Sequence, residues 1–335
     1  MKRTLFCLLL SLSLLLNACY DDNLENDLGS LRDSTKTSTA ASVTGLTRFT
    51  MNNLNIPSGG LPDGRRFYTN GIMRANTAYY PYSIIKEKRD GVDRMRFYVK
   101  PTLPTEYLSG TQYPYHHRAE ISRYPWRIQT PLGTEEWLGF SYFFAKSSEG
   151  YTQNQTPVSI FQNHDGVNGP PSVQIEIAAP KQLYSPSQSW YNTPKGGELM
   201  IINNVRGIRW VVPNFRVVAG TRLDIVVQLV YGSGKDGLFN VWINGKLQTW
   251  PGSDKVEAGN IGSTVFSNAR YGGNCKLGIY HHELRKKSAV DKNYSKGHTH
   301  MKVWMSNWND VFRKPGDWDY KNPNAYKAVS TASYP

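Results

Sequence analysis

Three short segments carry side chains that are suited to acid–base chemistry on a carboxylated substrate. They are His117-Arg118-Ala119-Glu120-Ile121, Phe161-Gln162-Asn163-His164 and Lys276-Leu277-Gly278-Ile279-Tyr280-His281-His282. If each segment is a strand, residues two apart share a face, and the polar side chains of each segment point to one side. Taken singly, each segment is also typical of a structural ion pair or a polar strand edge.

Taken together, these side chains predict the removal of a proton next to a carboxylate. Arg118 and Gln162 can neutralise or hydrogen-bond the carboxylate of a uronic acid, which stabilises the enolate-like charge that develops when the C5 proton leaves. The imidazole group titrates near neutral pH, so His164 is the natural base. Tyr280, on the same strand face as Lys276, is suited to protonate the departing O4, or to serve as base and acid in turn.

The order of the three segments resembles the signatures of the jelly-roll alginate lyases of polysaccharide lyase family 7. Those signatures are Arg-Ser/Thr-Glu-Leu/Val-Arg, Gln-Ile/Val-His and Tyr-Phe-Lys-Ala-Gly-x-Tyr-x-Gln, and they are similar to residues 118–122, 162–164 and 276–282 here. The heparin lyase I group shares the same general layout, and the turn at residues 241–246 looks like a hairpin of that group. The resemblance covers residues 90–310. It implies an all-β fold, a β-jelly roll in which two antiparallel sheets form a concanavalin-like sandwich.

The resemblance also implies a role for each residue of the motifs. Arg118 and Gln162 would hold the carboxylate, and His164 would neutralise it or act as the base. Tyr280 would donate the proton to O4, while Lys276 would bind substrate or tune Tyr280. Further substrate contacts are expected from Glu120, His282, His117 and Asn163. No cofactor is required by such a reaction, although a structural Ca²⁺ on loop oxygens stays open.

The motifs depart from the alginate lyase pattern at three positions. Ser122 replaces the second arginine of the first motif, although Arg123 follows it. Asn163 stands where the second motif has an aliphatic residue, and His282 stands where the third has glutamine. These departures favour a polymer that contains glucuronate or iduronate, such as ulvan, glucuronan or a heparin-like glycan, over alginate.

The N-terminus has the pattern of an exported lipoprotein. A positive start at Lys2 and Arg3 precedes an apolar run over residues 5–16, which is too short to span a membrane. Residues 16–19, Leu-Asn-Ala-Cys, resemble the bacterial lipobox, so we expect cleavage of a signal peptide at residues 1–18 and lipidation of Cys19. The acidic residues that follow are similar to surface-export signals of Bacteroidetes lipoproteins. The expected location is the outer membrane at the cell surface, with the lipid as the only membrane contact.

Composition divides the rest of the chain into a stalk and one folded domain. Residues 19–45 are polar and predict a flexible stalk, while residues 46–335 predict a single β-jelly-roll domain.

The net charge of the chain is +13. The signal contributes +2 and the stalk −3, which leaves about +14 on the domain. Such a field favours an anionic partner. Export argues against nucleic acid as the partner, so an acidic polysaccharide is expected. The protein is expected to be a monomer.

Cys275 is the only cysteine of the domain, which excludes an intramolecular disulfide.

The hydrophobic periodicity indicates many short strands and almost no helix. Strands are predicted at residues 94–100, 136–144, 172–178, 222–230, 239–243, 275–280 and 300–305. Asn244-Gly245 directly after the fifth of these predicts a tight hairpin. The chain after Phe312 is rich in turn residues and aromatics, and we expect it to pack as an irregular cover. Strands at this spacing favour a sandwich or jelly roll.

The sequence also allows three other interpretations. A retaining glycoside hydrolase needs two carboxylates about 5–5.5 Å apart, and Glu176 has no partner at same-face spacing. A non-catalytic glycan-binding protein would also use the basic charge, nine Trp and twenty-one Tyr, but it needs no base facing an acid. Zinc is not expected: adjacent histidines on a strand face opposite sides, and no further ligand completes a set with His298 and His300.

Overall fold

The computed structural model describes most of the predicted domain. The described residues are 46–50, 66–69, 73–76, 83–100, 117–123, 130–151, 157–165, 169–180, 191–250, 259–285, 287–298, 300–323 and 325–331. The chain divides into a unit at Met1–Val43 and a unit at Thr44–Pro335, and every described residue belongs to the second. The predicted signal peptide, Cys19 and the stalk therefore lie outside the described residues. No helix in the described part is long and apolar enough to cross a membrane.

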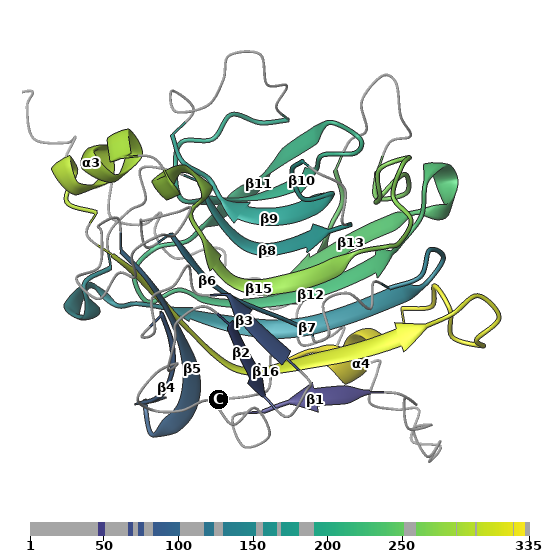
Figure 1. Cartoon of the computed structure of the whole chain (residues 1–335), viewed down its shortest axis with the longest axis horizontal. Coiled ribbons are helices and arrows are strands. Elements are labelled where there is room, and N and C mark those ends of the chain that lie inside the picture. Colours follow the sequence, from purple (N-terminus) through teal and green to yellow (C-terminus); the bar gives the residue numbers. More distant parts are fainter. Residues whose placement is uncertain are drawn as a thin grey trace, which may run out of the picture. The chain divides into compact units, whose positions relative to one another are not determined.

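Two eight-stranded antiparallel sheets make up the domain (Figure 1). Sheet A has the order β14 (Lys246–Gln248), β13 (Leu238–Ile243), β12 (Arg222–Val230), β7 (Glu135–Phe144), β16 (Met301–Arg313), β5 (Val92–Val99) and β4 (Ile84–Arg89), and β1 (Thr47–Phe49) pairs with β16. Sheet B has the order β11 (Ile208–Arg216), β10 (Glu198–Asn203), β9 (Val173–Ile177), β8 (Val158–His164), β15 (Asn274–Tyr280), β6 (Arg118–Arg123), β3 (Met73–Asn76) and β2 (Arg66–Thr69). The α-helices among the described residues are α3 (Lys287–Ser295) and α4 (Ala325–Val329). The predicted all-β sandwich of two antiparallel sheets is confirmed.

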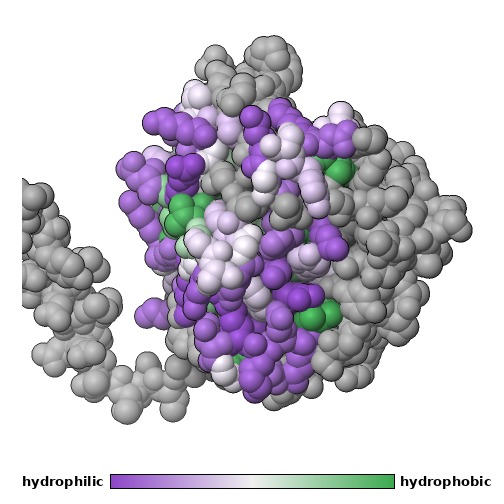
Figure 2. All heavy atoms as spheres, turned by 90° about the vertical axis from the view of Figure 1, so that its left-hand side faces the viewer, coloured by the Kyte–Doolittle hydropathy of each residue, from purple (hydrophilic) through white to green (hydrophobic). Residues whose placement is uncertain are grey.

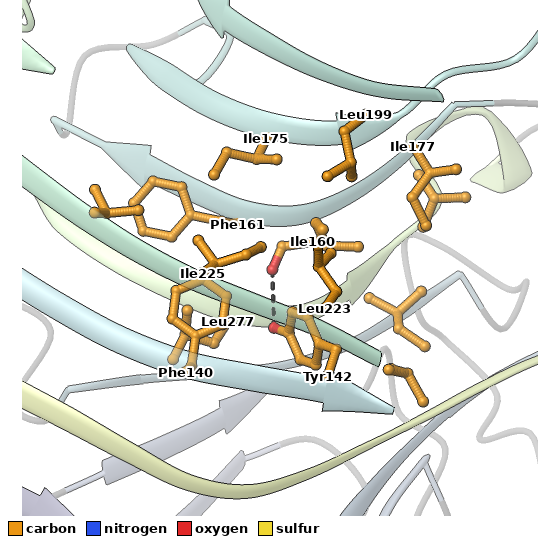
Figure 3. Close-up of a cluster of buried hydrophobic side chains, with 14 of the residues drawn as sticks. Phe140, Tyr142, Ile160, Phe161, Ile175, Ile177, Leu199, Leu223, Ile225 and Leu277 are labelled. Atoms are coloured by element: carbon orange, nitrogen blue, oxygen red, sulfur yellow. Dashed lines mark hydrogen bonds between the residues drawn. The ribbon is translucent and has the colours of Figure 1, made fainter. Parts of the chain in front are cut away.

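The core lies between the sheets because alternate residues of each strand are apolar. Figure 3 shows Phe140 and Tyr142 of β7 facing Ile160 and Phe161 of β8, with Ile175 of β9 in the same layer. All five side chains are at most 1% exposed. Burying a side chain of this size stabilises the fold by about 1.5–3 kcal/mol, and the core is large enough to hold the domain together without a disulfide. Cys275 is buried and unpaired.

The strands predicted from periodicity are present. The predicted hairpin joins β13 to β14, and its two central residues, Asn244 and Gly245, have the positive φ values of 48° and 83° that such a turn requires. The strand predicted at residues 300–305 is longer than expected, since β16 runs on to Arg313. Helices α3 and α4 were not predicted. Both are short, and their amphipathic pattern is too brief to stand out in the sequence.

The C-terminal tail covers the outer face of sheet A, as expected, but it does so with a helix. A Cβ on Gly139 of β7 would lie 1.8 Å from the backbone oxygen of Val329, so only glycine admits α4 at this distance. The Asn309 side chain donates a hydrogen bond of 3.0 Å to the same oxygen. On β13, two strands from β7 in the sheet, the Trp242 ring packs 5.3 Å from the ring of Tyr326. Sheet A is therefore covered on its outer face at β7, β16 and β13.

The flank that carries α3 and the β4–β5 hairpin is mainly hydrophilic (Figure 2). On the β4–β5 hairpin, several basic side chains are paired with acids. Asp93 lies 2.9 Å from Lys86 and 3.6 Å from Lys88, and Asp90 lies 3.4 Å from Arg94. Neighbouring carboxylates thus neutralise these cations. The hairpin therefore attracts an anionic polymer less strongly than its number of lysines and arginines indicates.

Candidate active site

The three predicted segments lie on three neighbouring strands of sheet B. β15 is in the middle, with β6 on one side and β8 on the other. In the register of these strands, Lys276 pairs with Gln162 of β8, and Tyr280 pairs with Arg118 of β6. Asn274, two residues before Lys276 on β15, pairs with His164 of β8. Residues more than 150 positions apart in the chain are therefore brought side by side by strand pairing alone.

The polar side chains of these strands share one face. The residues between them are buried in the core: Ala119, Ile121, Phe161, Leu277 and Ile279. Strand alternation then places the polar residues on the opposite, outer face of sheet B: Arg118, Glu120, Gln162, His164, Lys276 and Tyr280. Four of these are partly exposed, namely Arg118, His164, Lys276 and Tyr280, while Glu120 and Gln162 are only 3% and 1% exposed. We call this set of six residues the polar face.

Glu120 holds its two neighbours on the polar face in place. Its carboxylate lies 3.1 Å from Nε of Arg118 and accepts a short hydrogen bond from Nε2 of Gln162. The guanidinium carbon of Arg118 in turn lies 4.0 Å from the centre of the Tyr280 ring. Both carboxylate oxygens of Glu120 are thus directed at side chains of the protein. The substrate contact expected of Glu120 is replaced by a positioning contact, and the arginine is kept against the tyrosine.

His164 is held in its neutral form by its surroundings. Burial lowers the pKa of His164, and the positive charges of Lys276 and Arg118 lower it further. Asp165 and a hydrogen bond with the backbone of Gly169 act in the opposite direction, but the net pKa lies below the usual value. A neutral imidazole can accept a proton. The two cations beside it attract a substrate that carries a negative charge, so this position is suited to remove a proton from such a substrate.

Replacing Lys276 by Gln should change the pH dependence of activity. The variant lacks one of the cations that lower the pKa of His164, so this pKa rises and a larger fraction of the imidazole is protonated in mild acid. If neutral His164 is the base, we expect the acidic limb of kcat/KM against pH to move to higher pH, with more activity lost below about pH 6.5 than at about pH 8. The matched control is Lys246→Gln, on the exposed β13–β14 hairpin of sheet A. An acidic limb that moves to lower pH would show that the cationic form of His164 is the active one.

A bulge positions Tyr280, and a tyrosine of the other sheet supports it. The pairing of β15 with β8 shifts in register between Leu277 and Tyr280. The buried hydroxyl group of Tyr142, from β7, donates a 2.9 Å hydrogen bond to the carbonyl oxygen of Ile160 (Figure 3). The same hydroxyl accepts a hydrogen bond of 2.6 Å from the N–H of Gly278. Burial raises the pKa of Tyr142 well above its usual value, so this hydroxyl stays protonated and keeps both bonds.

Gly278 is required at the bulge for two reasons. Its φ of +132° lies where L side chains are strained, and a Cβ would lie 2.2 Å from the backbone oxygen of Ala119. Tyr142 and Gly278 together hold the irregular backbone that brings Tyr280 level with Ser159 of β8. A bulge beside a functional side chain is a common way to redirect it.

Tyr142→Phe should reduce turnover more than it affects substrate binding. The variant leaves the N–H of Gly278 and the carbonyl of Ile160 without the hydroxyl, at about 1–3 kcal/mol for a buried unsatisfied group. We expect a lower melting temperature, and a kcat about tenfold lower with little change in KM, because a small displacement of a reacting group costs much of its effect. Tyr151→Phe is the control, since the Tyr151 hydroxyl donates its 3.0 Å bond to Val217, away from the bulge. An equal loss of activity in both variants would contradict the role of Tyr142.

The two histidines that flank Tyr280 differ from the prediction in one respect. His117 is buried, and its ring centre lies 5.9 Å from that of Tyr280. His282 was expected to continue the strand face, but β15 ends at Tyr280, and His282 begins the short helix η5 (His282–Arg285). Its exposed ring still packs edge-on against Tyr280 at 5.8 Å. Both histidines therefore border the tyrosine, one beneath the surface and one at it.

The expected substrate contact of Asn163 is wrong. Asn163 is fully buried, and its side-chain nitrogen donates hydrogen bonds of 2.9 Å to Oγ of Ser172 and to the backbone oxygen of Gly272. It stands between Gln162 and His164 on a strand, and alternation turns it toward the interior. Asn163 therefore stabilises the backbone beneath the polar face instead of lining it.

No metal cluster is found among the described residues, which contain no group of three His, Cys, Asp or Glu side chains able to hold an ion. His298 and His300 contact different rings. His298 packs 5.6 Å from His281, and burial lowers its pKa to about 4, while His300 packs 5.8 Å from Tyr98. The expectation of a structural Ca²⁺ stays a prediction.

A family model described as polysaccharide lyase matches residues 70–309, which is more than half of the chain and contains every residue of the polar face. The chain belongs to this family. Several solved structures of lyases are similar to this chain at low identity. An endo-β-1,4-glucuronan lyase from the fungus Trichoderma reesei is 14% identical, with 80% of this polysaccharide lyase and 95% of that chain covered and a TM-score of 0.42. The alginate lyase AlgAT5 of polysaccharide lyase family 7 is also 14% identical, with 77% and 99% covered and a TM-score of 0.42. An alginate lyase from Alteromonas sp. 272 is 12% identical, with 73% and 96% covered and a TM-score of 0.43.

No curated protein matches the sequence of this lyase. The predicted assignment to the jelly-roll polysaccharide lyases is confirmed by the family match and by the two antiparallel sheets. The protein is therefore an enzyme that cleaves a polysaccharide by elimination.

Proposed function

We propose that this lyase cleaves an anionic polysaccharide containing glucuronate or iduronate, with the polar face as its catalytic surface. The observation that carries the proposal is that His164 and Tyr280 share one face with Arg118 and Lys276 on three adjacent strands. A glycan-binding surface needs the cations, but it has no use for a neutral imidazole and a phenol hydroxyl beside them.

β-Elimination assigns a task to each of these groups. The carboxylate of the uronate is placed against Arg118 and Lys276, which stabilise the negative charge that develops when the C5–H bond breaks. His164 takes the C5 proton. The electron pair of that bond forms the C4=C5 double bond, the C4–O4 bond breaks, and O4 leaves with the proton that Tyr280 donates. Where the sugar presents H5 and O4 on the same side, Tyr280 serves as base and acid in turn, and His164 hydrogen-bonds the carboxylate.

The substrate class follows from charge and from the departures in the motifs. The domain carries about +14 charges, which attracts a polyanion. Ser122, Asn163 and His282 differ from the alginate lyase pattern. We therefore place a glucuronate- or iduronate-containing polymer, such as ulvan, glucuronan or a heparin-like glycan, ahead of alginate.

The proposed location rests on the sequence of the first 45 residues. A lipobox cysteine, Cys19, followed by a polar stalk would tether the domain to the outer membrane and present it at the cell surface. A polymer too large to enter the cell has to be cut there. Mass spectrometry of the mature protein checks this proposal, because an unlipidated N-terminus at any residue other than Cys19 would contradict it.

A panel of polyuronates tests the activity. Alginate, glucuronan, ulvan, heparan and chondroitin types are incubated with the purified domain, and the ultraviolet absorbance of the unsaturated uronate product is followed. We expect absorbance to rise on at least one glucuronate or iduronate polymer and to rise less on alginate. Binding without any rise in absorbance would favour a glycan-binding protein, and no response on any polymer would refute elimination on a uronate.

A further inference from the structure

Exposed apolar side chains gather at the end of the domain where β8 and β16 finish, on the right in Figure 1. Trp318, in the turn after β16, is 72% exposed, more than any other large apolar side chain in the described part of the chain. Leu132, before β7, is 47% exposed, and Tyr271, before β15, is 45% exposed. A group of such side chains, unlike a single one, marks an interaction site.

Hydrogen bonds join the three segments that carry these side chains. The N–H of Gly272 donates a 2.6 Å hydrogen bond to the carbonyl oxygen of Thr130, and the N–H of Thr130 donates one of 3.3 Å to that of Gly273. The hydroxyl of Tyr320 donates a 2.7 Å hydrogen bond to the carbonyl oxygen of Gly133. The three segments therefore form one continuous surface. We call it the rim, and it consists of residues 130–133, 270–273 and 314–321.

The turn that carries Trp318 is held in place by contacts of its neighbours. The N–H of Lys314 donates a 2.7 Å hydrogen bond to the carboxylate of Asp317, and the N–H of Asp317 donates one of 3.0 Å to the carbonyl oxygen of Lys314. Asp319, directly after Trp318, is buried in an ion pair of 2.7 Å with Arg313. The indole is thus exposed on a fixed backbone, so a ligand can bind it without the entropy loss of ordering a loop.

The rim borders the polar face on the side of His164. Gly273 directly precedes Asn274, the first residue of β15, and Asn274 pairs with His164. Tyr271 stands three residues before Asn274, which is roughly 10 Å along an extended chain. A long polymer that is bound at the polar face can therefore reach the rim as well.

The exposed charges of the rim are mainly positive. Its exposed cations are Arg270, Lys314 and Lys321. Of its two acids, Asp319 is already paired with a buried arginine, which leaves Asp317 as the exposed one. The β4–β5 hairpin differs, because carboxylates neutralise its cations. The rim thus combines exposed rings with a surplus of positive charge, which suits a ligand that has both apolar faces and negative groups.

We propose that the rim, with Trp318 as its anchor, is a second binding surface for the anionic polysaccharide, separate from the residues that act on the cleaved uronate. The C–H groups on the face of a sugar ring pack against the indole, and the carboxylates of the polymer pair with the lysines and the arginine. The proposal rests on the proposed function for the identity of this ligand. The rim holds a stretch of polymer beyond the sugar at the polar face, and so keeps the polymer on the enzyme between cuts.

Trp318→Ala tests the anchor, because it should impair the use of long chains only. Affinity electrophoresis in gels that contain glucuronan measures binding, and the dissociation constant should rise about tenfold. On a polymer that is cleaved, kcat/KM should fall by about the same factor, while on the shortest oligosaccharide that is cleaved it should stay within about twofold. Trp318→Phe keeps a ring and should bind glucuronan within about threefold of the wild type.

Tyr294→Ala is the matched control. It removes an aromatic ring that is 50% exposed on α3, outside the rim, and it should leave the binding of glucuronan unchanged. The melting temperatures of both alanine variants should equal that of the wild type, because the two rings they remove are largely in water. An equal loss of binding in Tyr294→Ala and Trp318→Ala would refute a specific role of the rim.

Lys314→Gln tests the charge of the ligand. It should weaken the binding of glucuronan at low ionic strength, and the difference from the wild type should shrink at high salt, because salt screens exposed charges. A neutral glucan should not be retained by the wild type. Retention of the neutral glucan that is lost in Trp318→Ala would refute an anionic polymer as the ligand of the rim.

The remaining outcomes separate this proposal from the proposed function. Normal binding of glucuronan by Trp318→Ala would refute the rim as a binding surface while leaving the elimination chemistry in place. So would an equal loss of kcat/KM on the polymer and on the shortest oligosaccharide, since that result places Trp318 at the site of cleavage. Should no polyuronate give unsaturated product, the proposed function fails, and the gels with glucuronan still decide whether Trp318 binds the polymer.

Discussion

Tyr280→Phe should lower kcat by about a thousandfold and leave substrate binding within about threefold. The hydroxyl that donates the proton to O4 is lost, and a positioned acid or base contributes about 10²–10⁴ in rate. The ring remains, so the guanidinium of Arg118, 4.0 Å from the ring centre, keeps its packing partner and its contact with Glu120. Release of unsaturated product measures kcat, and calorimetry with an oligosaccharide substrate measures binding.

The control for this experiment is Tyr294→Phe, which removes a half-exposed hydroxyl from α3. It should have the kcat and the binding constant of the wild type. A Tyr280→Phe variant that keeps more than about a tenth of the wild-type kcat would exclude the hydroxyl as the acid. A parallel loss of binding and turnover would instead assign Tyr280 to substrate contact.

His164→Ala should lower kcat/KM by about 10²–10⁴ at neutral and alkaline pH, where His164 is uncharged. The imidazole is kept neutral by burial and by the charges of Lys276 and Arg118, and without it no group at that position accepts the C5 proton. The acidic limb of the pH profile that belongs to His164 should disappear together with the activity. Measurement of kcat/KM from mildly acidic to alkaline pH checks both effects.

The matched histidine control is His300→Ala. His300 packs against Tyr98 of β5 in sheet A, so its loss should leave kcat/KM unchanged. A His164→Ala variant with normal kcat and a raised KM would contradict the role of His164 as base. In that case Tyr280 takes and returns the proton, and His164 holds the carboxylate.

Much of the polar face could be predicted from the sequence because a strand has a period of two. Arg118 with Glu120, Gln162 with His164, and Lys276 with Tyr280 each stand two apart, so their sharing of a face depends only on local strand geometry. The same reasoning could have assigned Asn163 to the interior, since it stands between two residues of the polar face. The resemblance to the second motif led instead to a substrate contact.

The remaining features depend on contacts between residues far apart in the chain. Nothing near Tyr142 in the sequence indicates that its hydroxyl reaches Ile160 and Gly278 on the opposite sheet. In the sequence, Glu176 is a lone carboxylate without a partner at same-face spacing on its own strand. The two charged residues that shift its pKa, Arg209 and Glu283, come from β11 and from the turn after β15.

The side chains for elimination chemistry and the strands that carry them were determined by the sequence itself, because motifs and two-residue alternation are local properties. Only the tertiary structure decided that β15 lies between β6 and β8, that Glu120 joins Arg118 to Gln162, and that a bulge braced by Tyr142 brings Tyr280 level with Ser159. These features are set by strand order and register, which depend on how two whole sheets pack their apolar faces together. The same packing placed Glu176 in the row of Tyr280, two strands away.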